Sequence, residues 1–251
     1  MGTLIAHREG PVLTLRLSNP SKANALDLAM LGELDAQVAR VAGDATVRVV
    51  VLRGAHGGPF SSGADIGQWA PMPPEVFARD WIAHGNAIFR RFEALRCPTV
   101  AAIEGICFGG GLELALCADL RVAGPGARFR FPEVGIGAIP GWEGGPRLAR
   151  LVGRGRALEA VLTGREIDAA LAQVWGLANL QGAGGSFDDE LAALVQQLAS
   201  VSPHAAALAK AAVLDDGHTA DFHAQAGAAI KASPDSEIGI RAFAAKATAV
   251  F

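Results

Sequence analysis

The sequence predicts a mixed α/β domain followed by a helical C-terminal region. Short β-branched apolar runs, such as residues 48–53 and 99–103, alternate with helical patterns over about the first 140 residues, as in repeated crossover units of an α/β layer. From about Trp142 onward the pattern is helical. The last helices are rich in alanine, and thin helices of this kind seldom form a core alone. We therefore expect a core domain over residues 1–186 and a helical region over residues 187–251 that packs on this domain or on another subunit.

The individual elements are marked by alternation and by capping residues. Residues 4–7 and 12–17 alternate like two strands paired across a Gly-Pro turn. Asp27 is a suitable N-cap for a helix that runs to Val41. Further strands are expected at residues 48–53, 99–103 and 120–123, and further helices at residues 75–95, from the glycine run at 109–111 to Cys117, and near 187–200, 203–214, 219–232 and 236–247.

The composition excludes several classes of protein. The 251 residues are 51% hydrophobic and carry a net charge of only -3, so nucleic acid is not an expected partner. No apolar run approaches the ~20 residues that cross a bilayer, so no membrane association is expected. Charges at residues 7–9 interrupt the place of a signal peptide, and the three cysteines form no paired motif, which favours a cytoplasmic protein with reduced thiols. The six histidines share no metal-ligand spacing, so no metal site is expected.

Two glutamates are the candidate catalytic residues. Glu113 follows the triple glycine 109–111 at the start of a predicted helix, and Glu133 lies in a Pro-Glu-Val-Gly segment. Two carboxylates directed at one point can activate a water, because one takes a proton while the other gives one. For Glu113 the alternative is a carboxylate that only complements the helix dipole, and for Glu133 it is an acid on a surface loop.

Two loops rich in small residues follow buried strands. Residues 60–66 and 103–111 both lie at carboxyl ends of strands, where open α/β sheets bind ligands. Together they could direct two backbone N–H groups at one oxygen, as an oxyanion hole requires. The glycine spacing of the second loop does not fit the dinucleotide fingerprint, and no Gly-x-Ser-x-Gly elbow indicates a serine hydrolase.

The combination of these segments resembles the crotonase family of enoyl-CoA hydratases and isomerases. The resemblance rests on the order and spacing of Phe-Ser-Ser-Gly-Ala-Asp-Ile at 60–66, Gly-Gly-Gly-Leu-Glu-Leu-Ala at 109–115 and Pro-Glu-Val-Gly-Ile-Gly-Ala-Ile-Pro-Gly at 132–141. Asn-Ala-Leu at 24–26 is similar to the coenzyme A-binding loop of the family, and residues 233–243 are similar to its C-terminal helix. The resemblance covers nearly the whole chain. It implies a spiral of repeated strand-strand-helix units with a C-terminal helical trimerisation region.

The resemblance also implies an activity and a set of site residues. The activity is reversible syn addition of water to a 2-enoyl-CoA thioester, with an enolate stabilised at the thioester oxygen. It needs no metal or redox cofactor, since coenzyme A is part of the substrate, and the expected assembly is a homotrimer or homohexamer. In this chain the implied catalytic residues are Glu113, Glu133 and the amides of Ala64 and Gly110, and the implied substrate-binding residues are Lys22, Ala23, Ala25, Ser62, Asp65, Ile66, Gly141 and Trp142.

Some segments depart from the family pattern. Trp142 and the extra acid Glu143 stand where the family has small residues, and both are expected near the acyl end of the site. The segment 67–74, made stiff by the stretch Pro71–Pro74, is expected to line and restrict the acyl pocket. Lys22 stands beside Ser21, which replaces a common Lys or Arg. Alternatives therefore stay open: isomerisation, thioester hydrolysis or decarboxylation on the same scaffold, or a weakly catalytic acyl-CoA-binding protein. The sequence does not define the acyl group.

Overall fold

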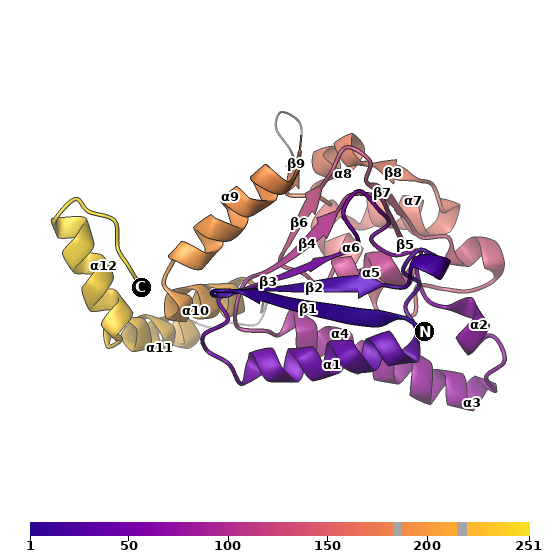
Figure 1. The fold of residues 1–251 in the computed structure, drawn as a ribbon, viewed down its shortest axis with the longest axis horizontal. Helices are drawn as coiled ribbons and strands as arrows, with labels where there is room; N and C mark the ends of the chain where they lie inside the picture. Colours follow the sequence, from indigo (N-terminus) through magenta and orange to yellow (C-terminus); the bar gives the residue numbers. More distant parts are fainter. Residues whose placement is uncertain (183–186, 215–219) are drawn as a thin grey trace.

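A six-stranded sheet forms the centre of the computed structural model, which describes residues 1–182, 187–214 and 220–251 (Figure 1). Its strands lie in the order β1-β2-β3-β4-β6-β9, and only the β1–β2 pair is antiparallel. The two N-terminal strands are paired as the sequence predicts. The bounds are β1 (Thr3–Glu9), β2 (Val12–Ser18), β3 (Val49–Arg53), β4 (Thr99–Ile103), β6 (Leu120–Ala123) and β9 (Leu180–Gln181).

A smaller sheet gives the fold its spiral form. It consists of β5 (Ile106–Phe108), β7 (Arg128–Arg130) and β8 (Ile167–Asp168). Because β4 belongs to the large sheet and β5 to the small one, and β6 and β7 repeat this alternation, each turn of the chain adds one strand to each sheet before a helix follows. This confirms the expected strand-strand-helix units. The helices that follow are α5 (Gly110–Ala115), α6 (Gly144–Val152), α7 (Arg154–Thr163) and α8 (Ala169–Trp175).

The prediction of an all-helical chain after Trp142 was wrong, because β8 and β9 lie there. Strand β5 was also missed, within a segment that was interpreted as a loop, and β7 lies in a segment for which no element was predicted. Each of these four strands has only two or three residues. Such strands show no periodicity of their own, and pairing with distant segments defines them.

One face of the large sheet is covered by two helical segments. Helix α1 (Leu28–Ala42) begins at Asp27, whose side chain accepts a hydrogen bond from Met30 N, as expected of an N-cap. The helix predicted at residues 75–95 is divided into α3 (Pro74–Val76), a π-helical segment η2 (Phe77–Ala83) and α4 (His84–Glu93). π-Helical turns are rare and frequently occur at functional sites. Here the segment places Trp81 in the core.

The other face of the sheet is covered by α9 (Phe187–Ser200). Leu191 of this helix packs with Val49, Val51 and Val100 of the strands, so the first helix beyond residue 187 shares a core with the sheet. For α9 this fits the first of the two expected places for the C-terminal helices, the core domain, while packing on another subunit stays a prediction. The boundary expected after residue 186 itself falls at residues 183–186, outside the described residues.

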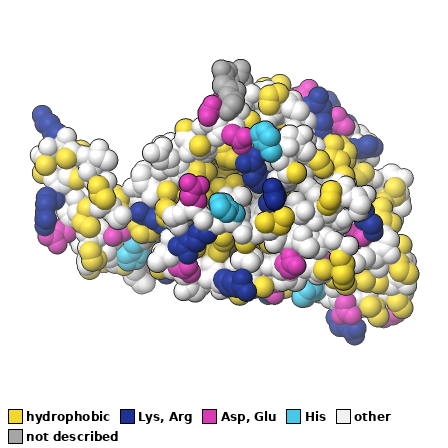
Figure 2. All heavy atoms as spheres, in the orientation of Figure 1, with side chains coloured by type: hydrophobic (Ala, Val, Ile, Leu, Met, Phe, Trp, Pro, Cys, Tyr) yellow, Lys and Arg dark blue, Asp and Glu magenta, His cyan; other side chains and the backbone are white. Residues whose placement is uncertain are grey.

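The remaining helices form an arm to one side of the sheet. Helix α10 (Pro203–Leu214) is held by an ion pair of 2.8 Å between Lys210 Nζ and Asp119 Oδ2. Helices α11 (Ala220–Lys231) and α12 (Pro234–Ala244) extend away from the sheet (Figure 1). Apolar side chains lie among charged ones on the surface of this arm (Figure 2), and Phe243 is 86% exposed.

Three further observations bear on the expectations from composition. None of the helices in the described ranges is long and apolar enough to cross a membrane. Among the same residues no group of His, Cys, Asp and Glu side chains could hold a metal ion, and His218 lies outside them. Cys107 and Cys117 are buried in the core, and Cys97 is half-buried as a free thiol.

Candidate active site

A cavity of about 540 Å³ lies at the carboxyl ends of the central parallel strands. Its wall includes Ser62, Gly63 and Ala64 from the loop after β3, and Gly109 and Gly110 from the segment after β4 and β5. Glu113 and Glu133 are the only ionisable side chains among the residues that line it. The two candidate glutamates therefore face one apolar space, as the sequence predicts.

Among the described residues, the backbone N–H groups of Ala64 and Gly110 have no hydrogen-bond acceptor. Ala64 pairs with Leu26 in an isolated parallel β-bridge. Its two hydrogen bonds run from Leu26 N to Gly63 O and from Asp65 N to Leu26 O, so the bridge does not use the N–H of Ala64. Gly110 is the first residue of α5, where an N–H has no partner within the helix. A Cβ at Gly110 would lie only 3.2 Å from Ala64 N, which shows how closely the two loops approach. The arrangement fits a pair of donors for one oxyanion.

Glu113 is buried in the wall of the cavity, with only 2% of its surface exposed. Its Oε1 accepts hydrogen bonds from the backbone amides of Trp142 at 2.7 Å and Gly144 at 2.9 Å. Burial raises the pKa of Glu113 to about 8; the nearby Glu133 adds to this rise, whereas the Gly144 hydrogen bond opposes it. Glu113 is thus a proton-holding group near neutral pH, which a carboxylate that served only the helix dipole would not be.

Glu133 begins the short 3-10 helix η3 (Glu133–Ile136) on the other side of the cavity. Its Oε2 is buried and has no hydrogen-bond partner among the described residues. Burial raises the pKa of Glu133 to about 7. A buried carboxylate oxygen without a partner is costly and is typical of a group that binds a water or substrate.

The predicted substrate-binding residues divide into two groups. Ser62, Ile66, Gly141 and Trp142 lie on the cavity wall, whereas Lys22, Ala23, Ala25 and Asp65 lie beside it. In the second group Lys22 Nζ is 2.6 Å from Asp65 Oδ2. The loops that carry the two groups are joined by hydrogen bonds from Ser62 N to Ala23 O and from Ser62 Oγ to Lys22 O. Contact of these residues with a substrate stays a prediction.

The apolar part of the wall was largely missed from the sequence. It includes Trp69, Phe77, Trp81, Ile82 and Ile139. The stretch Pro71–Pro74 does not line the cavity; its flanking residues Trp69 and Phe77 do, with ring centroids 5.5 Å apart. The expectation for the segment 67–74 is therefore confirmed for Trp69 and was wrong for the prolines. The aromatic residues on either side of the prolines were the available signal.

The side chains of Trp142 and Glu143 point in different directions although the two residues are adjacent. The Trp142 ring is 1% exposed, stacks on Trp81 with centroids 5.5 Å apart and forms part of the wall. Glu143 does not line the cavity, because its carboxylate turns to Arg90 and Arg147. The expectation that Glu143 adds an acid near the acyl end of the site was wrong. Its pKa is lowered, chiefly by the Arg90 hydrogen bond.

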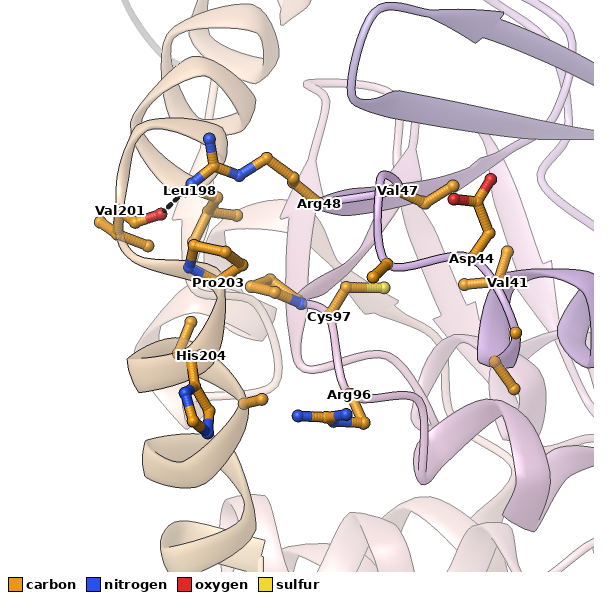
Figure 3. A pocket seen from close by; sticks show the side chains of 16 residues that line it. Val41, Asp44, Val47, Arg48, Arg96, Cys97, Leu198, Val201, Pro203 and His204 are labelled. Carbon is orange, nitrogen blue, oxygen red and sulfur yellow. Dashed lines mark hydrogen bonds between the residues drawn. The ribbon is translucent and has the colours of Figure 1, made fainter. Parts of the chain in front are cut away.

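A second cavity, of about 280 Å³, lies at the opposite ends of the same strands (Figure 3). It is bordered by the end of α1, by Arg48 before β3, by Cys97 before β4 and by the α9–α10 turn. The Arg48 guanidinium donates to Val201 O, and His204 lies on α10 (Figure 3). Without a pair of carboxyl groups, this cavity lacks the acid-base machinery of the first.

The spiral fold, the paired buried carboxyl groups and the two unpaired amides of the described site are the features that acid-base catalysis with a stabilised oxyanion requires. A family model described as enoyl-CoA hydratase/isomerase matches residues 7–251. The chain therefore belongs to the enoyl-CoA hydratase/isomerase family, and its fold is the crotonase fold.

Individual relatives agree with this assignment. A short-chain-enoyl-CoA hydratase of Clostridium acetobutylicum is 35% identical over 213 residues, which cover 85% of this chain and 81% of that protein. A crotonyl-CoA hydratase of Syntrophomonas wolfei is 33% identical over 99% of this chain and 97% of its own. The crystal structure of an enoyl-CoA hydratase from Bacillus anthracis has a TM-score of 0.93 and 33% identity, covering 99% of this chain and 98% of that chain.

Proposed function

We propose that this protein is an enoyl-CoA hydratase that adds water reversibly, with syn geometry, across the double bond of a 2-enoyl-CoA thioester. The observation that carries the proposal is the pair Glu113 and Glu133, whose pKa values of about 8 and about 7 place two carboxyl groups near their titration points on one apolar cavity. Family membership and the hydratases among the relatives support the same reaction.

The amides of Ala64 and Gly110 hold the thioester oxygen in this proposal. Attack of water on the β-carbon moves an electron pair onto that oxygen and forms an enolate. Each well-placed donor in an oxyanion hole contributes about 3–4 kcal/mol to the transition state. Glycine at 110 suits this role for a second reason, because a Cβ there would lie 2.5 Å from the Trp142 ring.

The two glutamates handle the protons. One carboxylate takes a proton from the attacking water, and the other carboxyl group gives a proton to the α-carbon. Because both pKa values lie close to neutrality, the pair holds roughly one proton at the pH where both roles are needed. Elimination of water uses the same groups in exchanged roles. No metal or redox cofactor takes part.

The surroundings of the cavity suit the rest of the substrate. In this proposal the half-exposed Lys22, which pairs with Asp65 in the structure, binds the phosphates of coenzyme A, and the aromatic wall receives the acyl group. No Lys, Arg or His side chain is among the described residues that line the cavity, and this lining favours an uncharged acyl group. We place the enzyme in the cytoplasm as a homotrimer or homohexamer.

A panel of 2-enoyl-CoA thioesters tests the proposal by loss of the conjugated-enoyl absorbance, with the product identified by mass spectrometry. Formation of a 3-hydroxyacyl-CoA is the expected result. Release of free coenzyme A or of carbon dioxide, or a shifted double bond without added water, would instead indicate hydrolysis, decarboxylation or isomerisation. Binding of the thioesters without turnover would indicate an acyl-CoA-binding protein.

A further inference from the structure

Residue 143 has a backbone conformation that glutamate rarely adopts. Its φ of 64° and ψ of 22° lie in the left-handed region, immediately before α6. A non-glycine residue in this region is strained and persists only where its surroundings hold it. The residues on either side, Trp142 and Gly144, are those whose N–H groups converge on Glu113 Oε1. A left-handed residue between two amides lets both point at one anion, as in a backbone nest.

The side chain of Glu143 holds this conformation from outside the cavity. Its two carboxylate oxygens accept hydrogen bonds from Nε and Nη2 of Arg90 on α4, a bidentate pair across 53 residues of sequence. Arg147 Nη2 approaches the same carboxylate at 3.3 Å. Bidentate Arg–carboxylate pairs fix orientation as well as distance. Neither Arg90 nor Glu143 lines the cavity.

Arg147 links this cluster to the turn itself. It is 3% exposed, and its Nη1 donates a 2.7 Å hydrogen bond to Trp142 O. Its Nε and Nη2 contact Glu93 Oε2 of α4 at 3.2 and 2.9 Å. The 142–144 turn is thus attached to α4 through two ion pairs, one on the left-handed residue and one on the arginine that binds the preceding carbonyl.

We propose that Glu143 and Arg90 are positioning residues: their ion pair keeps residue 143 left-handed, and this conformation keeps the Trp142 and Gly144 amides directed at Glu113. The inference rests on the proposed function, in which Glu113 is a catalytic acid or base. It gives the extra acid of this sequence a role in supporting the backbone. It also predicts that glycine at position 143 makes the ion pair unnecessary, because glycine adopts a left-handed conformation without strain.

The sign of the effect on Glu113 follows from its surroundings. Burial and the charge of Glu133 on η3 raise its pKa, whereas the two amides and Arg147 on α6 lower it. If the amides of Trp142 and Gly144 no longer donate to Glu113, its carboxylate loses stabilisation, and the pKa of Glu113 rises further. Glu143 itself faces Arg90 on α4 and Arg147 and Arg150 on α6, which keep it ionised.

The test compares Glu143→Ala, Glu143→Gly, Arg90→Ala and the double variant Glu143→Gly/Arg90→Ala. Alanine loses the ion pair and disfavours the left-handed region, so kcat should fall by roughly tenfold to a hundredfold, the effect of a small displacement of a catalytic group, with KM little changed. Arg90→Ala should show a similar loss. Glycine should restore most of kcat, and Arg90→Ala should add no further loss in the glycine background.

Two controls keep the outcome decisive. Glu159→Ala breaks a comparable ion pair between Glu159 on α7 and Arg165, which follows that helix, and should leave kcat and KM unchanged. The pKa of Glu113, followed by NMR of its side-chain carboxyl carbon, should rise in Glu143→Ala and not in Glu143→Gly, and this measurement needs no turnover. Equal behaviour of the alanine and glycine variants, or an Arg90→Ala loss that is the same in both backgrounds, would overturn the inference. A wild-type protein that hydrates no enoyl thioester would contradict the proposed function alone, because the NMR comparison still tests whether the Glu143–Arg90 ion pair directs the amides at Glu113.

Discussion

Gly109 and Glu133 lie so close together that a side chain at position 109 would displace the carboxyl group: a Cβ there would stand 2.5 Å from Glu133 Oε1. Gly109 also has a φ of 47°, in the left-handed region that favours glycine. Its position immediately before Gly110 means that one backbone segment both makes room for a carboxyl group and supplies an oxyanion donor. The first glycine of the run is thus explained by Glu133 and the second by Ala64 and Trp142.

Gly109→Ala should lower hydration turnover by roughly a hundredfold, since a displaced acid-base group loses most of its contribution of 10²–10⁴. The measurement is kcat on an enoyl thioester, with circular dichroism to confirm folding. Gly135→Ala is the matched control, because a Cβ there meets no atom within 4 Å. Equal activity of the two variants would show that Glu133 does not depend on the space at position 109.

Glu113→Gln and Glu133→Gln should each reduce turnover by a factor of roughly 10² or more, the range for a positioned acid or base. Amide replaces carboxylate with almost no change in shape, so the fold should persist. Both variants are assayed by loss of the enoyl absorbance under single-turnover and steady-state conditions. Near-normal hydration by either one would contradict the two-glutamate mechanism.

Glu113→Gln should also change the pH dependence of stability. The pKa of Glu113 in the folded protein, about 8, lies above the unfolded value near 4.3. The contribution of the buried, protonated Glu113 to the free energy of unfolding is therefore complete at low pH and is lost as the pH rises through the folded pKa. Glutamine cannot ionise and escapes this loss. The Tm of the variant minus that of the wild type should therefore become more positive between about pH 5 and pH 9. A constant or falling difference would show that the pKa of Glu113 is not raised.

Trp142→Ala should widen the acyl pocket and weaken the fold together. The ring stacks on Trp81, meets Phe89 edge-on at 5.2 Å and donates from Nε1 to Trp81 O. Removing a buried aromatic ring costs about 3–5 kcal/mol, so Tm should fall. Activity toward longer or branched enoyl thioesters should rise relative to the shortest one. Trp142→Phe keeps most of the ring and serves as the control, and an unchanged substrate profile in Trp142→Ala would show that the ring does not limit the pocket.

Much of the fold and the polar part of the site could be predicted from the sequence. The sequence identified four residues that the structure brings to one cavity: Glu113, Glu133, Ala64 and Gly110. They could be identified because they lie in or beside glycine-rich and strand-end segments with strong local patterns. The short strand β5 was not predictable, since pairing with β7 defines it. Local pattern decides where such a residue stands along the chain, and long-range packing decides which elements meet.

Side-chain direction was the other limit. Glu143 and Trp142 are adjacent in the sequence, yet the Glu143 side chain points to the outer face and the Trp142 side chain to the core. The difference depends on Arg90, which is 53 residues away, and on a left-handed backbone that no local motif indicates for glutamate. The π-helical segment has a similar effect, because its wide turn changes which residues of the predicted helix 75–95 face the cavity.

The C-terminal arm leads to a prediction about assembly. Ile240 and Phe243 of α12 and Val213 of α10 are exposed. Among the described elements, α11 has its main contacts with α10 and α12. Exposed apolar residues on an extended arm are typical of a subunit interface. The intact chain should therefore form a trimer or hexamer at micromolar concentration, as measured by light scattering. Because α9 covers the sheet, deletion of residues 187–251 would expose the core. Truncation after Leu214 keeps α10, removes α11 and α12, and should give a folded monomer. Glu159→Ala, far from the arm, should assemble normally. A monomeric intact chain would contradict the prediction, and so would an oligomer that survives the truncation.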